Sequence, residues 1–102
     1  MKYAGAQPSV QVGIQPSAVP TLGPKFQFRK EDFGGLLFDT ETWHLLRLNE
    51  TASHTLQLVN GQRTVADIAK EVAKRHDIAI ELVLSDVAQL LSQLASGGVV
   101  AI

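Results

Sequence analysis

Three histidines, His44, His54 and His76, are the side chains of this sequence best suited to metal binding or acid–base chemistry. They fall on different expected elements and have no ligand spacing to one another or to carboxylates, whereas a metal site needs several donors that converge on one point. The absence of cysteine excludes thiolate metal sites, thiol catalysis and a disulfide framework. We therefore expect surface or hydrogen-bonded histidines, no metal ion and no cofactor.

The glycine pairs and the acidic residues form no catalytic pattern either. Gly34-Gly35 and Gly97-Gly98 lack the spacings and the following lysine of a phosphate-binding loop. Asp39 and Glu41 flank an expected hairpin loop, where they serve to solvate it. No Ser–His–Asp arrangement follows from the spacing, so the sequence predicts a protein that is not an enzyme.

The composition indicates one small globular domain. A length of 102 residues and an apolar share of 45% are ordinary for such a domain. The net charge of −1 gives no reason to expect a polyanionic partner. No apolar run reaches membrane-spanning length, and no apolar segment follows the first three residues as it would in a signal peptide. We expect a cytoplasmic protein with no membrane partner, which the lack of cysteine fits.

Three short segments have the pattern of β-strands. They cover residues 25–30, 36–38 and 43–48, and the first alternates apolar and polar side chains. Turn-forming residues separate them, in the glycine-containing segment 31–35 and in the polar loop 39–42. This spacing predicts an antiparallel meander of three strands.

The third strand is apolar on both faces. One face carries His44, Leu46 and Leu48, and the other carries Trp43, Leu45 and Arg47. We expect Leu46 and Leu48 in the core. Trp43 and Leu45 then need another cover, which the N-terminal arm, a second copy of the chain or a ligand would supply.

Apolar residues recur at helical spacing in three further segments, residues 50–59, 65–75 and 80–95. The expected core positions are Ala52, Thr55, Leu56 and Val59, then Val65, Ile68, Ala69 and Val72, and finally Ile80, Val83, Leu84, Val87, Leu91 and Leu94. Asn49 is an expected N-cap, and Thr64 with Asp67 forms a capping box for the second helix. Asn60-Gly61 ends the first helix.

The order of three strands followed by three helices predicts an α+β domain over residues 25–102, with the helices on one face of the sheet. Residues 1–24 differ from it. They hold all four prolines and a single charge, so we expect a disordered or loosely attached arm, with docking on the domain as the alternative.

A winged-helix protein that binds nucleic acid is the main alternative, because the helix pair 50–75 has the length of a helix-turn-helix. Its charge argues against this function. Residues 76–102 contain no Lys or Arg, and the basic residues of the second helix are balanced by Asp67 and Glu71. A DNA-binding domain normally presents a basic face to the phosphates. We therefore expect no nucleic-acid partner.

As an ordered set, several motifs resemble the PqqD-like family, also called RiPP recognition elements, which are peptide chaperones of ribosomal-peptide modification. The motifs are Leu48-Asn49, Thr51-Ala52, Asn60-Gly61, Thr64-Val65 and a late helix with Asp86, Val87, Leu90, Leu91 and Leu94. The likeness covers about residues 25–100, and the arm 1–24 lies outside it.

The resemblance implies a winged-helix-like fold and a function without catalysis. Such domains bind the leader of a precursor peptide and present it to a modifying enzyme, often a radical SAM enzyme, as in pyrroloquinoline quinone or related biosynthesis. The leader is implied to add as a strand beside residues 43–48, in the groove next to helix 80–94. An edge strand offers free backbone groups for such pairing.

The expected peptide-binding residues come from this strand and helix. They are Trp43, Leu45, Leu46, Arg47, Leu48, Leu82, Asp86, Gln89, Leu90 and Gln93. Leu82 is expected to be exposed, Leu90 fits core and pocket equally, and Arg47 is either solvated or paired with a leader carboxylate. The implied partners are a leader peptide and a peptide-modifying enzyme, with a homodimer left open.

Overall fold

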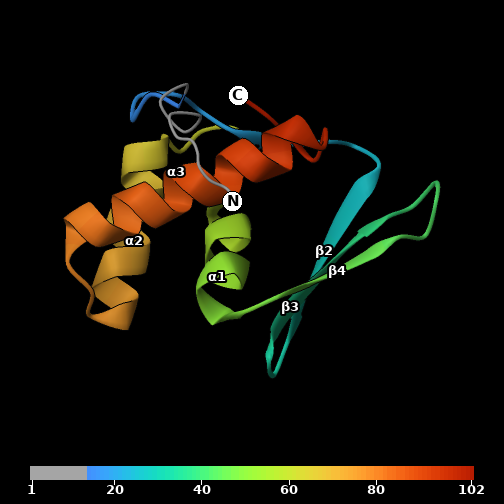
Figure 1. Ribbon diagram of the computed structural model, residues 1–102, viewed down its shortest axis with the longest axis horizontal. Coiled ribbons are helices and arrows are strands. Elements are labelled where there is room, and N and C mark those ends of the chain that lie inside the picture. Colours follow the sequence, from blue (N-terminus) through green and yellow to red (C-terminus); the bar gives the residue numbers. More distant parts are fainter. Residues whose placement is uncertain (1–13) are drawn as a thin grey trace, which may run out of the picture.

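The computed structural model describes residues 14–102 and confirms the predicted α+β fold, in which a three-stranded antiparallel sheet is followed by three helices. The elements are β1 (Thr21–Leu22), β2 (Phe26–Glu31), β3 (Gly34–Asp39), β4 (Leu45–Leu48), α1 (Glu50–Leu58), α2 (Val65–His76), α3 (Ile80–Ser96) and β5 (Val100–Ala101). Helix α1 lies between the sheet and α2, and α3 packs against both helices (Figure 1). The core joins Leu37 and Leu48 of the sheet and Leu56 of α1 to the apolar faces of α2 and α3.

Most of the predicted core positions are buried. All four positions of α2 are buried, as are four of the six of α3. The two exceptions in α3 are Ile80, which is exposed, and Leu84, which is half-buried. In α1, Leu56 and Thr55 are buried while Ala52 and Val59 are half-buried. Helices α2 and α3 thus close the core on the side away from the sheet.

The strands β2, β3 and β4 lie side by side in that order, so that β2 and β4 form the two edges of the sheet. The turn between β2 and β3 consists of Asp32 and Phe33 alone, because Glu31 pairs with Gly34. The two glycines belong to β3 and not to the turn. The Ser53 hydroxyl of α1 donates to the Gly34 carbonyl at 2.7 Å, so α1 crosses the sheet at very close range here.

Strand β4 is shorter than predicted. It begins at Leu45, since Trp43 has a φ of 64° and its N–H donates to the Asp39 carbonyl at 2.7 Å within a tight loop. The expectation that Leu46 belongs to the core is wrong. Its side chain is 46% exposed, whereas Leu48 is 4% exposed. On the inner face of β4, Leu48 is covered because α1 begins beside it, whereas Leu46, two residues earlier, is open to solvent.

The helix caps form as predicted. The Asn49 Oδ1 accepts the Ala52 N–H at 2.9 Å and caps α1. The Thr64 hydroxyl accepts the Asp67 N–H, and the Asp67 carboxylate accepts the Thr64 N–H, which completes the capping box of α2. Helix α1 ends at Leu58, just before the predicted Asn60-Gly61 stop.

Residues 14–24 differ from the loosely attached arm that the composition predicts. The Ala18 and Pro16 carbonyls accept the Val65 and Ala66 N–H groups, each at 2.9 Å, and β1 pairs with β5. The first N–H groups of a helix have no partner within it, so α2 offers this segment ready donors. Residues 1–13 lie outside the described part of the chain.

Candidate functional site

In the described part of the chain, no strand pairs with the outer edge of β4, so backbone groups along this edge are available for hydrogen bonding. Hydrogen-bonded and non-hydrogen-bonded pairs alternate along an antiparallel ladder. The Asp39 N–H donates to the His44 carbonyl at 3.0 Å, and the β3–β4 register continues from there, so Leu46 and Leu48 direct their backbone groups toward β3. The N–H and C=O groups of Leu45 and Arg47 therefore point to the open edge, where they can bond an added strand.

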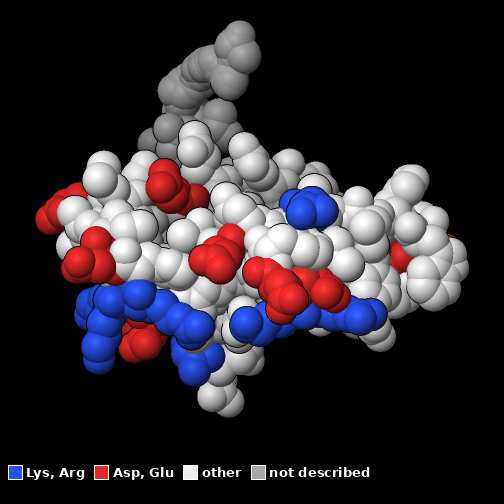
Figure 2. Space-filling model, turned by 90° about the horizontal axis from the view of Figure 1, so that it is seen from below, with Lys and Arg blue, Asp and Glu red and all other residues white. Residues whose placement is uncertain are grey.

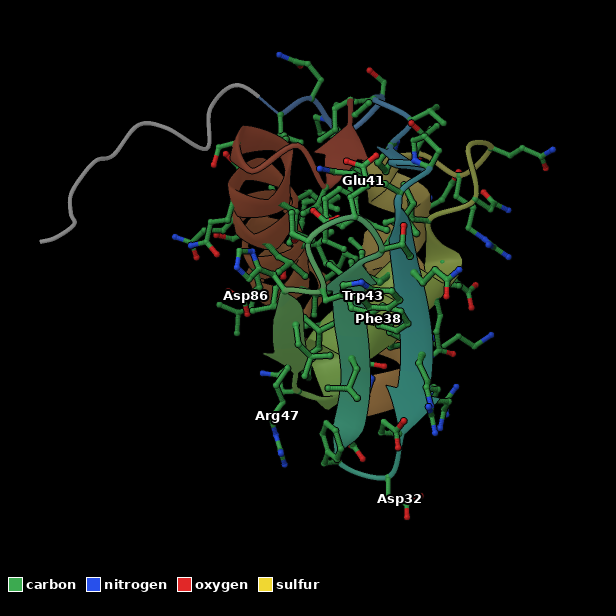
Figure 3. All side chains as sticks on the ribbon, turned by 90° about the vertical axis from the view of Figure 1, so that its right-hand side faces the viewer. Asp32, Phe38, Glu41, Trp43, Arg47 and Asp86 are labelled. Carbon is green, nitrogen blue, oxygen red and sulfur yellow. The ribbon has the colours of Figure 1, made fainter. Side chains whose placement is uncertain are left out.

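The side chains of Leu45 and Arg47 project from the outer face of the sheet, away from the helices. Trp43 stacks on Phe38 with ring centroids 6.4 Å apart and planes inclined by 16°. The Arg47 guanidinium lies 3.8 Å from the centroid of the Phe33 ring. Figure 3 shows Trp43 and Phe38 over the sheet, while Arg47 points outward from the β4 edge. The outer face thus presents an apolar group at one end of β4 and a cation at the other.

Asp39 holds the loop that places Trp43. Its Oδ1 accepts the N–H groups of Glu41 and Thr42, and its Oδ2 lies 3.1 Å from the Lys25 Nζ. Partial burial raises the pKa of the Asp39 carboxyl, but the Glu41 N–H, the Lys25 ammonium and the Thr42 N–H together lower that pKa to about 2. Asp39 therefore has a structural role beyond solvating the loop, while Glu41 remains exposed.

A pocket of about 260 Å³ opens between α1 and α3. Asp86, Gln89, Leu90 and Gln93 of α3 line it, together with Asn49, Thr51, Ala52, Thr55, Val72, Ile78, Val83 and Val87. Asn49 directly follows Leu48, so the pocket begins where β4 ends. Its wall is apolar at its base and polar at its rim, a combination typical of sites for an apolar side chain of a polar ligand.

The ten residues expected to bind a peptide do not all meet at this site. Four line the pocket, and Leu45, Leu46 and Arg47 lie along the exposed edge strand. Leu48 is buried in the core and offers no side chain to a ligand. Leu82 is 63% exposed, as predicted, but it is not among the residues that line the pocket. Trp43 lies over the sheet and not within β4.

The comparisons with known proteins concern the family and the fold of the chain. The family model for coenzyme PQQ synthesis protein D (PqqD) matches residues 34–100, which include β3, β4 and all three helices. The chain belongs to the PqqD family. The PqqA binding protein of Bradyrhizobium diazoefficiens is 37% identical over 54 residues, which make up 53% of this chain. The match covers 52% of that protein, so the PqqD-family chain spans about half the length of this curated relative.

Three solved structures share the fold of this PqqD-family chain. The PqqD part of Methylobacterium extorquens PqqCD, described as a stand-alone RiPP recognition element, has a TM-score of 0.74 at 24% identity and covers 90% of this chain and 98% of its own. Lasso peptide synthetase B1 with its leader peptide has a TM-score of 0.71 at 24% identity, and the match covers 83% of this chain and 100% of that one. TbiB1 with the TbiA(beta) leader peptide has a TM-score of 0.69 at 15% identity, and the match covers 78% of this chain and 93% of that one. The winged-helix-like fold of a RiPP recognition element is confirmed.

Two of the histidines lie close together, which their spacing along the chain did not indicate. The rings of His54 in α1 and His76 in α2 lie with centroids 5.4 Å apart and line a second pocket, on the side of α1 that faces the β2–β3 turn. No cluster of three or more His, Asp or Glu side chains over residues 14–102 has the arrangement of a metal site. Within the same residues, no helix is both long and apolar enough to cross a membrane.

The His54 environment predicts a dependence of stability on pH. Burial lowers the pKa of His54 from 6.5, and the positive charges of Arg75 and His76 lower it further against the opposing effect of Glu71. At a pH between the lowered pKa of His54 in the folded protein and its higher pKa in the unfolded chain, the unfolded chain binds more protons than the folded one. We expect the free energy of unfolding to be highest above pH 6.5 and to fall as the pH drops below it. Urea unfolding at pH 7.5 and 5.5 measures this, and His54→Gln should flatten the difference; an equal difference in the variant would contradict this cause.

Charged residues on the surface are mixed in sign. Figure 2 shows acidic side chains directly beside the basic ones on one face of the molecule. Lys70, Lys74 and Arg75 lie on α2 with Asp67 and Glu71, as the sequence indicates. This face does not form the uniform basic surface that neutralises nucleic-acid phosphates.

Proposed function

We propose that this PqqD-family chain binds the leader of a ribosomally made precursor peptide by strand addition to β4, and that it does so without catalysis. The observation that carries the proposal is the free edge of β4, where Leu45 and Arg47 each offer a backbone donor and acceptor beside the pocket between α1 and α3. Backbone pairing supplies affinity for any extended chain, and pockets for side chains supply selection.

The alternation of a strand assigns its side chains to two surfaces. Leader residues that face inward lie on the side of Leu46 and approach the α1–α3 pocket, whose rim includes Asp86, Gln89 and Gln93. Residues that face outward lie beside Leu45 and Arg47. Leu46 is exposed because nothing within residues 14–102 covers its inner face, and a bound leader would bury it.

The bound leader brings its precursor to a modifying enzyme. We infer a radical SAM enzyme or another peptide-modifying enzyme, in the biosynthesis of pyrroloquinoline quinone or a related product. The names of the relatives support the class of ligand, since one is a PqqA binding protein and two structures hold leader peptides. The exposed Trp43 and Leu45 leave a second copy of the chain as a further partner.

Trp43 gives a direct measure of leader binding, because it is the only tryptophan of the chain and lies two residues before Leu45. We expect leader peptides from precursor genes beside this gene to change its fluorescence in a saturable manner. The core segment of the same precursor is the matched control and should cause no such change. If none of these leaders bound the folded protein, the proposal would be wrong.

A further inference from the structure

The outer side of β4 is chemically asymmetric. Its first residue, Leu45, is 63% exposed and lies opposite Phe38, and the Trp43 ring stacks on the Phe38 ring. Two residues later, Arg47 projects from the same face beside the Phe33 ring. An extended chain on this edge meets an apolar surface at one end and a positive charge at the other.

The Arg47 charge is available to a ligand. None of the three ion pairs formed within residues 14–102 includes Arg47, whereas Lys25 and Arg29 are each paired with carboxylates. The Phe33 ring lies under the guanidinium and leaves its edges open, where carboxylate oxygens bind an arginine best. Arg47 is thus positioned to pair with an acidic side chain.

Backbone bonds alone cannot fix the position of a leader on this strand. Strand β4 has four residues, and a slip of the leader by two residues repeats the same bonding pattern with other side chains. Cross-strand pairs on one face of the sheet distinguish such registers, because opposite charges and apolar pairs each stabilise the correct one. The pair of Leu45 and Arg47 can therefore set both register and direction.

We propose that the leader contains an acidic residue followed, two positions later, by a large apolar residue, with an aliphatic residue between them. This inference rests on the proposed function and specifies its ligand. The sheet is antiparallel throughout, and an antiparallel leader passes Arg47 before Leu45. The acid then lies opposite Arg47 and the large apolar residue opposite Leu45, while the aliphatic residue between them faces inward beside Leu46.

Four synthetic peptides with one common framework test this order. They carry Glu-Leu-Phe, Gln-Leu-Phe, Lys-Leu-Phe and the reversed Phe-Leu-Glu, and binding is measured by Trp43 fluorescence and by amide shifts of β4. For the unmodified chain we expect the first to bind about two- to fivefold more tightly than the glutamine peptide, which is the range of an exposed cross-strand ion pair. The lysine and reversed peptides should bind more weakly still.

A charge exchange separates this inference from a general effect of net charge. Arg47→Glu should reverse the preference, so that the lysine peptide binds more tightly than the glutamate peptide. Arg29→Glu is the matched control, since Arg29 lies on the same face in the same row of the sheet but on the opposite edge strand. This variant should keep the order of the four peptides.

The outcomes distinguish the two proposals. Equal binding of all four peptides, with β4 amides shifted in each case, would overturn the inference about the ligand and leave strand addition intact. Tighter binding of the reversed peptide would overturn the direction. Failure of every peptide and of every natural leader to shift the β4 amides would overturn both.

Discussion

Replacing Arg47 with proline is expected to weaken leader binding at least about tenfold while leaving the fold in place. The Arg47 N–H points to the open edge of β4 and has no partner in β3, so its loss breaks no bond of the sheet. A proline on an edge strand is tolerated when its missing N–H faces solvent. A leader strand, however, loses this hydrogen-bond donor and contacts the pyrrolidine ring in its place. The lost hydrogen bond and this contact together weaken the binding free energy of the leader by more than about 1.4 kcal/mol.

Lys30→Pro provides the matched control for this variant. Lys30 is also a basic residue of an edge strand, and the β2–β3 register with the Thr40 N–H bond to the Lys25 carbonyl directs its N–H outward as well. Both variants should lower the unfolding midpoint by similar amounts, and Arg47→Ala isolates the contribution of the side chain. Unchanged leader affinity in Arg47→Pro, or an equal loss in Lys30→Pro, would mean that β4 is not the docking edge.

Gly34→Ala is expected to lower the free energy of unfolding by about 3 kcal/mol or more. Gly34 has a φ of 141°, and a Cβ built there would lie 2.3 Å from the Leu48 carbonyl oxygen and 2.6 Å from the Asn49 carbonyl carbon. These are backbone atoms at the junction of β4 and α1, so the contact cannot be relieved by the rotation of a side chain. Strain at such a φ costs about 1–3 kcal/mol, and overpacking adds a similar amount.

Gly98→Ala separates the contact from the backbone strain. Gly98 has a φ of 78°, also positive, but no atom of the described residues lies within 4 Å of its added Cβ. Gly98→Ala should therefore lower the free energy of unfolding only by the backbone strain of about 1–3 kcal/mol. Thermal unfolding of both variants measures the difference, which we expect to be several degrees in Tm. Equal loss in the two variants would show that the β4–α1 junction has room for a side chain.

Local patterns in the sequence predicted most of the fold because their causes are local. The caps at Asn49 and Thr64 depend on side chains within three residues of the helix start, and the core stripes of α2 and α3 follow from helical spacing. The family resemblance then indicated β4 and α3 as the candidate site. These predictions required no knowledge of how distant segments pack.

The remaining features depend on contacts between distant segments, which a pattern of residues does not contain. Leu46 is exposed because α1 covers only the Leu48 end of β4, and His54 meets His76 only after α1 and α2 have packed. Docking of Ala18 on the start of α2 likewise joins residues 47 positions apart. The α1 side of the pocket was missed because Ala52 and Thr55 were assigned wholly to the core, although the helical spacing of Asn49, Ala52 and Thr55 could have indicated a shared face.

Hydrogen exchange of individual amides tests strand addition to β4 most directly. In the free protein, the amides of Leu45 and Arg47 face solvent and should exchange rapidly. A saturating leader peptide should slow both strongly, while the outward amides of Phe28 and Lys30 on the opposite edge should exchange as before. A leader that binds to saturation without slowing exchange at Leu45 and Arg47 would contradict the proposed mode of binding.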